Sequence, residues 1–123
     1  MSENKNVCSG GPTLIFSCSG AADVGEISDR AARKLSKEGA GAMFCLAGLG
    51  GKVEPIIKKT ASASKILAID GCNLDCVKLC LQEAGFNEFE HLRVTDLGME
   101  KGSSPASDKN IDKVTAKAIE MLS

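Results

Sequence analysis

Short apolar runs alternate along the chain with stretches whose apolar residues recur at helical spacing. Apolar runs of strand length, bounded by glycine or polar residues, are typical of buried strands in a parallel sheet. Such strands are predicted at residues 13–18, 42–46, 65–70 and 92–95. After each run, apolar residues return every three or four positions, which predicts a helix. These helices are expected over residues 23–39, 55–61, 72–85 and 111–122.

This order of elements predicts the fold class. Strands that alternate with helices imply a parallel sheet covered by helices on both faces, with right-handed crossovers. We therefore expect an α/β protein: a single three-layer Rossmann-like domain with a mostly parallel four-stranded sheet. The glycine-rich segment 47–51 is expected to be a flexible loop, and residues 102–107 form another. Neither segment is long enough to link domains, so residues 1–123 are expected to form one domain.

Composition and charge exclude several classes of function. The 123 residues include 15 basic and 16 acidic side chains, and the net charge is -1. Without a cluster of basic residues there is no electrostatic footprint for DNA or RNA, and aromatic rings on which bases could stack are scarce. There is no apolar run of membrane-spanning length and no signal pattern at the start. We expect a cytoplasmic protein without a nucleic-acid or membrane partner.

Six cysteines carry the candidate chemistry. In a reducing cytosol structural disulfides are rare, so clustered thiols indicate a metal site or redox chemistry. Cys18 and Cys45 end the first two predicted strands, Cys72 follows the third, and Cys76 lies one helical turn later. Ligands of parallel sheets bind at the carboxyl ends of the strands, where these cysteines fall. We therefore expect the four thiols to form one site.

Zinc is the metal that best suits such a site, because it favours four ligands in a tetrahedron and binds thiolates. A helix start at Cys72 would stabilise its thiolate through free N–H groups and the helix dipole. Cu(I) and an iron–sulfur cluster also accept thiolate ligands and stay open as alternatives. Asp70 and Asp96, near the ends of their strands, are candidates to support the ligands. Turn capping is the favoured role for both aspartates.

The motifs around these cysteines resemble those of a known family. They are Cys-Ser-Gly at 18–20, Met-Phe-Cys-Leu-Ala-Gly at 43–48 with Gly-Gly at 50–51, Ile-Asp-Gly-Cys at 69–72, and Cys76. Together they resemble the DGC domain family, which is described as zinc-binding and is named for its Asp-Gly-Cys motif. The likeness runs from about Thr13 to Gly98. It implies that Cys18, Cys45, Cys72 and Cys76 chelate the metal, and it implies no reaction.

Other interpretations stay open. The thiols could be buried structural residues, since free cysteine is often buried. The chain could be a thiol redox or sulfur-transfer enzyme that attacks with Cys72 and resolves with Cys18, Cys45 or Cys76. It could also be a scaffold that binds a partner and whose metal orders the loops. No catalytic residue, substrate, protein partner or oligomeric state is predicted.

Two further cysteines and the single histidine are given minor roles. Cys8 and Cys80 lie outside the four-cysteine pattern, and Cys80 is expected in the core, although it could also be an alternative ligand or a resolving thiol. His91 is expected to precede the fourth strand as a surface or packing residue, which argues against a Cys–His catalytic pair. Residues 19–28 contain no Arg or Lys, so a phosphate-binding loop after Cys18 is disfavoured. The glycine loop also lacks a dinucleotide or Walker pattern.

Overall fold

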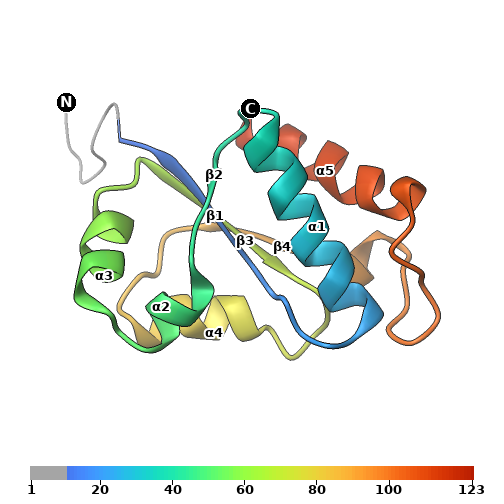
Figure 1. The fold of residues 1–123 in the computed structure, drawn as a ribbon, viewed down its shortest axis with the longest axis horizontal. Coiled ribbons are helices and arrows are strands. Elements are labelled where there is room, and N and C mark those ends of the chain that lie inside the picture. The colour runs from blue at the N-terminus through green and yellow to red at the C-terminus, as the bar shows by residue number, and fades with distance from the viewer. Residues whose placement is uncertain (1–10) are drawn as a thin grey trace.

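Four parallel strands form the central sheet of the computed structural model, which describes residues 11–123 (Figure 1). They are β1 (Thr13–Ser17), β2 (Ala42–Met43), β3 (Lys65–Asp70) and β4 (Glu90–Arg93). Their order across the sheet is β2-β1-β3-β4, and every pairing is parallel. The predicted α/β class is confirmed, and the sheet is parallel throughout the described part of the chain.

Helices cover both faces of this sheet, as predicted (Figure 1). Helices α1 (Asp23–Lys37) and α5 (Asp108–Leu122) share one apolar cluster with Ile15, Leu67 and Ile69 of the strands. The other face carries α2 (Leu46–Gly50), α3 (Glu54–Ala61) and α4 (Cys76–Glu83). Here the alternate strand residues, including Leu14, Phe16 and Ala68, form a second apolar cluster. Because neighbouring strand residues point to opposite faces, the continuous apolar runs seen in the sequence fill both clusters.

Helix α1 follows its sequence pattern closely. Val24, Ile27, Ala31 and Leu35 return at helical spacing and are fully buried against the sheet. The helix ends just before Gly39, whose φ of +83° is readily adopted only by glycine. This helix and the segment that follows β1 lie together at the edge of the sheet where the cysteines are found.

Two predicted boundaries on the cysteine side of the sheet were wrong. The segment 47–51, expected as a flexible loop, contains α2, because the thiol of Cys45 accepts a hydrogen bond from the backbone N of Gly48 at 3.3 Å and caps the helix. The helix predicted from residue 72 begins only at Cys76, because Asp75 has a left-handed conformation with φ of 54°. Leu74, expected on the apolar stripe of that helix, is 62% exposed.

The fourth strand also differs from its prediction. It spans Glu90–Arg93 rather than residues 92–95, and a 3-10 helix, η1 (Val94–Leu97), continues from it. His91 therefore lies within the strand and not before it. Cys8 lies outside the described residues. Within residues 11–123, none of the helices combines the length and the apolar character needed to cross a membrane.

Candidate functional site

The cysteines of the described chain follow the carboxyl ends of three neighbouring strands. Cys18 comes directly after β1, Cys72 after β3, and Cys45 lies two residues after β2 as the N-cap of α2. Cys76 is the first residue of α4, and Cys80 lies one turn further along that helix. Cys18, Cys72 and Cys80 are partly buried, whereas Cys45 and Cys76 are exposed. The thiols are thus reachable from solvent at one edge of the sheet.

The pKa of the Cys76 thiol depends on several neighbouring side chains. Burial raises its pKa above the ordinary value of 9.0, and the charges of Cys18, Asp70, Cys72 and Cys80 raise it further. Cys76 is therefore a protonated thiol at neutral pH when no cation is bound. A cation bound among these groups would reverse this effect and favour the thiolate, with release of the proton.

Three other thiols receive hydrogen bonds from nitrogen. The Cys18 sulfur accepts from the backbone N of Gly20 at 3.4 Å, and the Lys101 ammonium donates to the Cys72 sulfur at 3.6 Å. The Cys45 sulfur accepts from the backbone N of Gly48, as described above. Such donors stabilise negative charge on sulfur. These cysteines therefore have polar neighbours, unlike thiols packed in an apolar core.

The donor chemistry of the cysteines fits a soft cation, but their spacing is wider than a bound ion would impose. In a tetrahedral site with Zn–S distances of about 2.3 Å, the sulfurs lie about 3.8 Å apart. In the described residues, no three cysteine sulfurs lie within 4.8 Å of one another. The thiols therefore have to move toward one another to hold a common ion.

Asp70, Asp75 and His91 form a compact group, with ligand atoms within 4.8 Å of one another. Asp70, of which 1% is exposed, accepts hydrogen bonds from the backbone N atoms of Val77 at 2.8 Å and Lys78 at 3.1 Å. The Nε2 atom of His91 lies 2.8 Å from Oδ2 of Asp70. The capping role predicted for Asp70 is confirmed, since it bonds to the first turn of α4. The surface or packing role predicted for His91 missed this contact with the motif aspartate.

Asp75, the third member of this group, is already paired with a cationic side chain. The Arg93 guanidinium binds its two carboxylate oxygens at 3.0 and 2.7 Å, and this hydrogen bonding lowers the pKa of Asp75. A guanidinium at this position repels a second cation. Asp96 makes only 3.4 Å contacts with Arg93, and its side chain is 63% exposed. We therefore interpret Asp70, Asp75, His91 and Arg93 as a network that fixes the turn between Cys72 and Cys76.

Gly71 explains why the motif has a glycine between its aspartate and cysteine. A Cβ atom at this position would lie 2.9 Å from the backbone C and O atoms of Val24 in α1. The turn after β3 therefore packs directly on the backbone of α1, and only glycine allows this approach.

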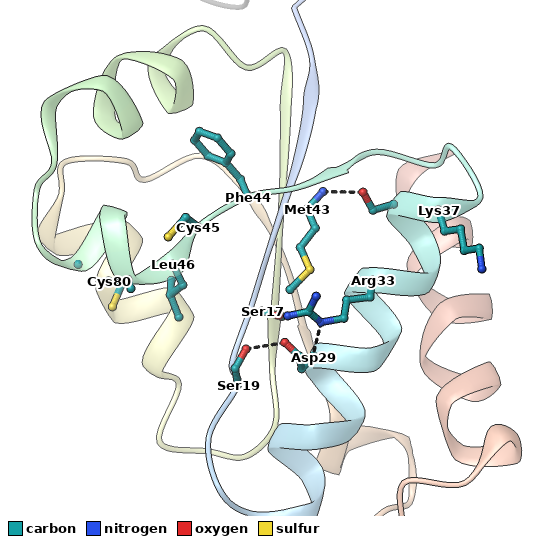
Figure 2. A pocket seen from close by; sticks show the side chains of 13 residues that line it. Ser17, Ser19, Asp29, Arg33, Lys37, Met43, Phe44, Cys45, Leu46 and Cys80 are labelled. Atoms are coloured by element: carbon teal, nitrogen blue, oxygen red, sulfur yellow. Dashed lines mark hydrogen bonds and ion pairs between the residues drawn. The ribbon is translucent and has the colours of Figure 1, made fainter.

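An open cavity of about 1020 Å³ adjoins two of the cysteines (Figure 2). Cys45 and Cys80 line it on the side of α2 and α4, while Arg33 and Lys37 of α1 line the opposite side. The core position expected for Cys80 is only partly met, because it is half-buried and faces this cavity. Arg33 was not predicted near the end of β1, because it lies beyond residues 19–28 and reaches this place only through the path of α1.

Comparison with known proteins identifies the family. No solved structure matches the chain with significance, so its Rossmann-like character stays a prediction. The Anaerobic and virulence modulator AnvM of Pseudomonas aeruginosa (strain PAO1) is 35% identical over 88 residues, which cover 72% of this chain and 67% of that protein. The family model of the DGC domain matches residues 14–118. The chain therefore belongs to the DGC domain family.

Proposed function

We propose that this chain is a zinc-binding protein with a regulatory role, and that Cys18, Cys45, Cys72 and Cys76 hold one Zn²⁺. The observation that carries the proposal is the delivery of these thiols to one edge of the sheet, after β1 and β3 and at the starts of α2 and α4. Four thiolates are a ligand set that zinc favours. The motif match to the DGC domain family supports the same choice of residues.

The position of the thiols favours metal sensing or handling over a purely structural staple. Closed four-cysteine zinc sites are usually structural. Here, however, two buried apolar clusters already supply a core, and a domain of this length folds without a staple. Exposed Cys45 and Cys76 leave the edge open to exchange of the ion. The relative AnvM is named as a modulator, which supports a regulatory role for this chain.

The surrounding residues have defined parts in this proposal. Bound zinc would supply the positive charge that keeps its ligands as thiolates. The backbone N–H groups of Gly20 and Gly48 and the ammonium of Lys101 offset the negative charge of the sulfurs. Asp70 holds the first turn of α4, so that Cys76 stays at the edge.

Metal analysis of protein purified without added metal tests the proposal. We expect about one zinc per chain in the wild type and its loss in Cys72→Ser. Cys80→Ser is the matched control, because Cys80 lies on the same helix as Cys76 but outside the proposed set, and it should keep the metal. A folded wild type that contains no metal and takes up none would refute the proposal. Loss of zinc in Cys80→Ser would refute the choice of ligands.

The contact between Lys101 and Cys72 favours a second candidate, a thiol redox or sulfur-transfer enzyme that attacks with Cys72. The helix dipole cannot activate this thiol as expected, because α4 begins four residues later, but the Lys101 ammonium lies 3.6 Å from its sulfur and could assist attack. In metal-free protein, Cys72 should then react with iodoacetamide faster than the other thiols. Lys101→Gln should slow this reaction, and Lys58→Gln, on exposed α3, should not. Uniform reactivity of the thiols would rule this candidate out.

A further inference from the structure

The cavity beside Cys45 has a polar end that none of the cysteines forms. At this end lie Ser17, the last residue of β1, and Arg33 of helix α1 (Figure 2). The thiols of Cys45 and Cys80 lie at the other side, on α2 and α4. The polar end is thus built from residues that the zinc proposal does not use.

Ser17 is the first sign that this end receives a ligand. The residue is 2% exposed and lines the cavity, yet its Oγ atom has no hydrogen-bond partner among the described residues. Buried hydroxyl groups in proteins are almost always hydrogen-bonded. An acceptor brought by a ligand would complete the bonding of this side chain.

The charges around Ser17 give the ligand its sign. Figure 2 shows Arg33 reaching from α1 toward Ser17, whereas the Lys37 side chain, four residues later, points away from them. The Nε atom of Arg33 donates to Asp29 at 2.8 Å, and its terminal N–H groups make no other hydrogen bond within residues 11–123. Asp29 also accepts from the hydroxyl of Ser19 at 2.8 Å. The terminal N–H groups of Arg33 therefore stay available to an acceptor brought by a ligand.

Asp29 stays ionised at neutral pH, which limits the charge of the ligand. Partial burial acts to raise the pKa of Asp29, but hydrogen bonds from Arg33 and Ser19 outweigh it and hold the pKa below 3.8. A dianion such as phosphate would be repelled by this carboxylate more strongly than a monoanion. The terminal N–H groups of Arg33 therefore match a single carboxylate, which a guanidinium can bind through two N–H groups.

The middle of the cavity is apolar. Met43, Phe44 and Leu46, all half-buried, line it between the charged end and the thiols. Figure 2 shows the Met43 side chain extending from β2 toward Arg33. Methionine is unbranched and flexible, so its side chain can move aside and open the way to Ser17.

We propose that this cavity binds a small organic monocarboxylate with an apolar body. Its carboxylate pairs with Arg33 and accepts a hydrogen bond from the Ser17 hydroxyl. Its apolar body packs on Met43, Phe44 and Leu46. The site goes beyond the proposed zinc function, although Cys45 belongs to the wall of this cavity.

Titration of hexanoate into ¹⁵N-labelled protein as purified, followed by NMR, tests the proposal. We expect saturable shifts at the amides of residues 17–19 and 43–46, and none with hexanamide, which has the same shape without the charge. Arg33→Gln should weaken binding by at least about tenfold, because a charge-assisted pair is lost. Arg30→Gln is the matched control, because Arg30 forms a similar pair with Glu26 on α1 but does not line the cavity.

Several results would overturn the proposal. Absence of saturable shifts with hexanoate would show that the cavity holds only water. Equal binding of hexanamide, or equal effects of Arg33→Gln and Arg30→Gln, would show that the charged end selects nothing. Tighter binding of inorganic phosphate at the same amides would show that the ligand class is wrong. Ser17→Ala tests whether the Ser17 hydroxyl binds the carboxylate, and unchanged hexanoate affinity in that variant would show that it does not.

Discussion

The Nε2 atom of His91 in β4 lies 2.8 Å from Oδ2 of Asp70 at the end of β3. The same carboxylate accepts the backbone N–H groups of Val77 and Lys78 in the first turn of α4. The N-cap residue of this helix, Asp75, makes no capping hydrogen bond with its own side chain. Asp70 of the motif therefore caps α4, although it precedes Val77 by seven residues. It also connects β3 and β4 to the helix that carries Cys76 and Cys80.

Replacement of this carboxylate should destabilise the fold. In Asp70→Asn, one oxygen becomes an N–H₂ group that faces backbone donors, and hydrogen bonds to a buried charge are lost. We expect the free energy of unfolding to fall by about 2 kcal/mol, measured by urea denaturation of metal-free protein. Asp96→Asn, which changes an exposed aspartate, should alter it by no more than about 0.5 kcal/mol. Similar effects of the two substitutions would show that the buried network adds no stability.

The glycine of the motif makes a second prediction. In Gly71→Ala, the new Cβ atom would clash with the backbone of Val24, 2.9 Å away, so the turn or α1 has to shift. We expect a loss of about 2 kcal/mol in the free energy of unfolding, in the range found for overpacked cores. Gly50→Ala provides the control, because its Cβ would meet only the Cys80 sulfur at an ordinary 3.6 Å. A chain that tolerates both substitutions equally would contradict the close packing of this turn on α1.

The sequence predicted those elements whose conformation depends on the pattern of apolar residues. Helix α1 and strand β3 were found because burial alone sets their faces. The start of α4 was not found, because it depends on the left-handed conformation of Asp75 and on a cap that comes from Asp70. Neither the left-handed conformation nor the distant cap has a local sequence signal. The composition of segment 47–51 indicated a loop, and only the thiol cap from Cys45 shows why a short helix forms there.

The topology predicted the edge where the cysteines gather, but it did not predict which other side chains lie near that edge. Parallel strands place Cys18, Cys45 and Cys72 at one edge whatever their exact spacing. Arg33 could not be assigned to the same place, because it depends on how α1 returns past β1. His91 was misplaced because the strand boundary lies two residues earlier than the apolar run suggests. Side-chain partners across the sheet therefore required the structure.

Two buried serines offer a third prediction, since their surroundings differ. The Ser28 hydroxyl donates to the carbonyl O of Cys18 at 2.7 Å and lies 3.2 Å from that of Ile69, whereas the Ser17 hydroxyl has no partner in the described chain. Ser28→Ala should lower the free energy of unfolding by about 1 kcal/mol. Ser17→Ala should leave it unchanged or raise it, because it removes an unsatisfied buried group. Urea denaturation of both variants checks this, and a larger loss in Ser17→Ala than in Ser28→Ala would contradict it.

The last prediction concerns pH and the loop that precedes α5. The Asp23 carboxylate accepts the backbone N–H of Gly102 at 2.9 and 3.0 Å and that of Ser104 at 3.0 Å. These hydrogen bonds, from Gly102 first and Ser104 second, hold the pKa of Asp23 below its ordinary value of 3.8. A group whose pKa is lowered by folding adds stability above its ordinary pKa, and this stability is lost as the pH falls through the folded pKa.

The free energy of unfolding of wild type and Asp23→Asn, measured from pH 7 down to acid, tests this directly. We expect the wild type to be the more stable at neutral pH, and the difference to shrink as the pH falls below 3.8. Glu26→Gln, which removes an exposed pair with Arg30 on the same helix, should change the free energy little. A difference between wild type and Asp23→Asn that grows on acidification would have the wrong sign for a carboxylate bound by these N–H groups. It would show that the ionised form of Asp23 does not anchor the loop to α1.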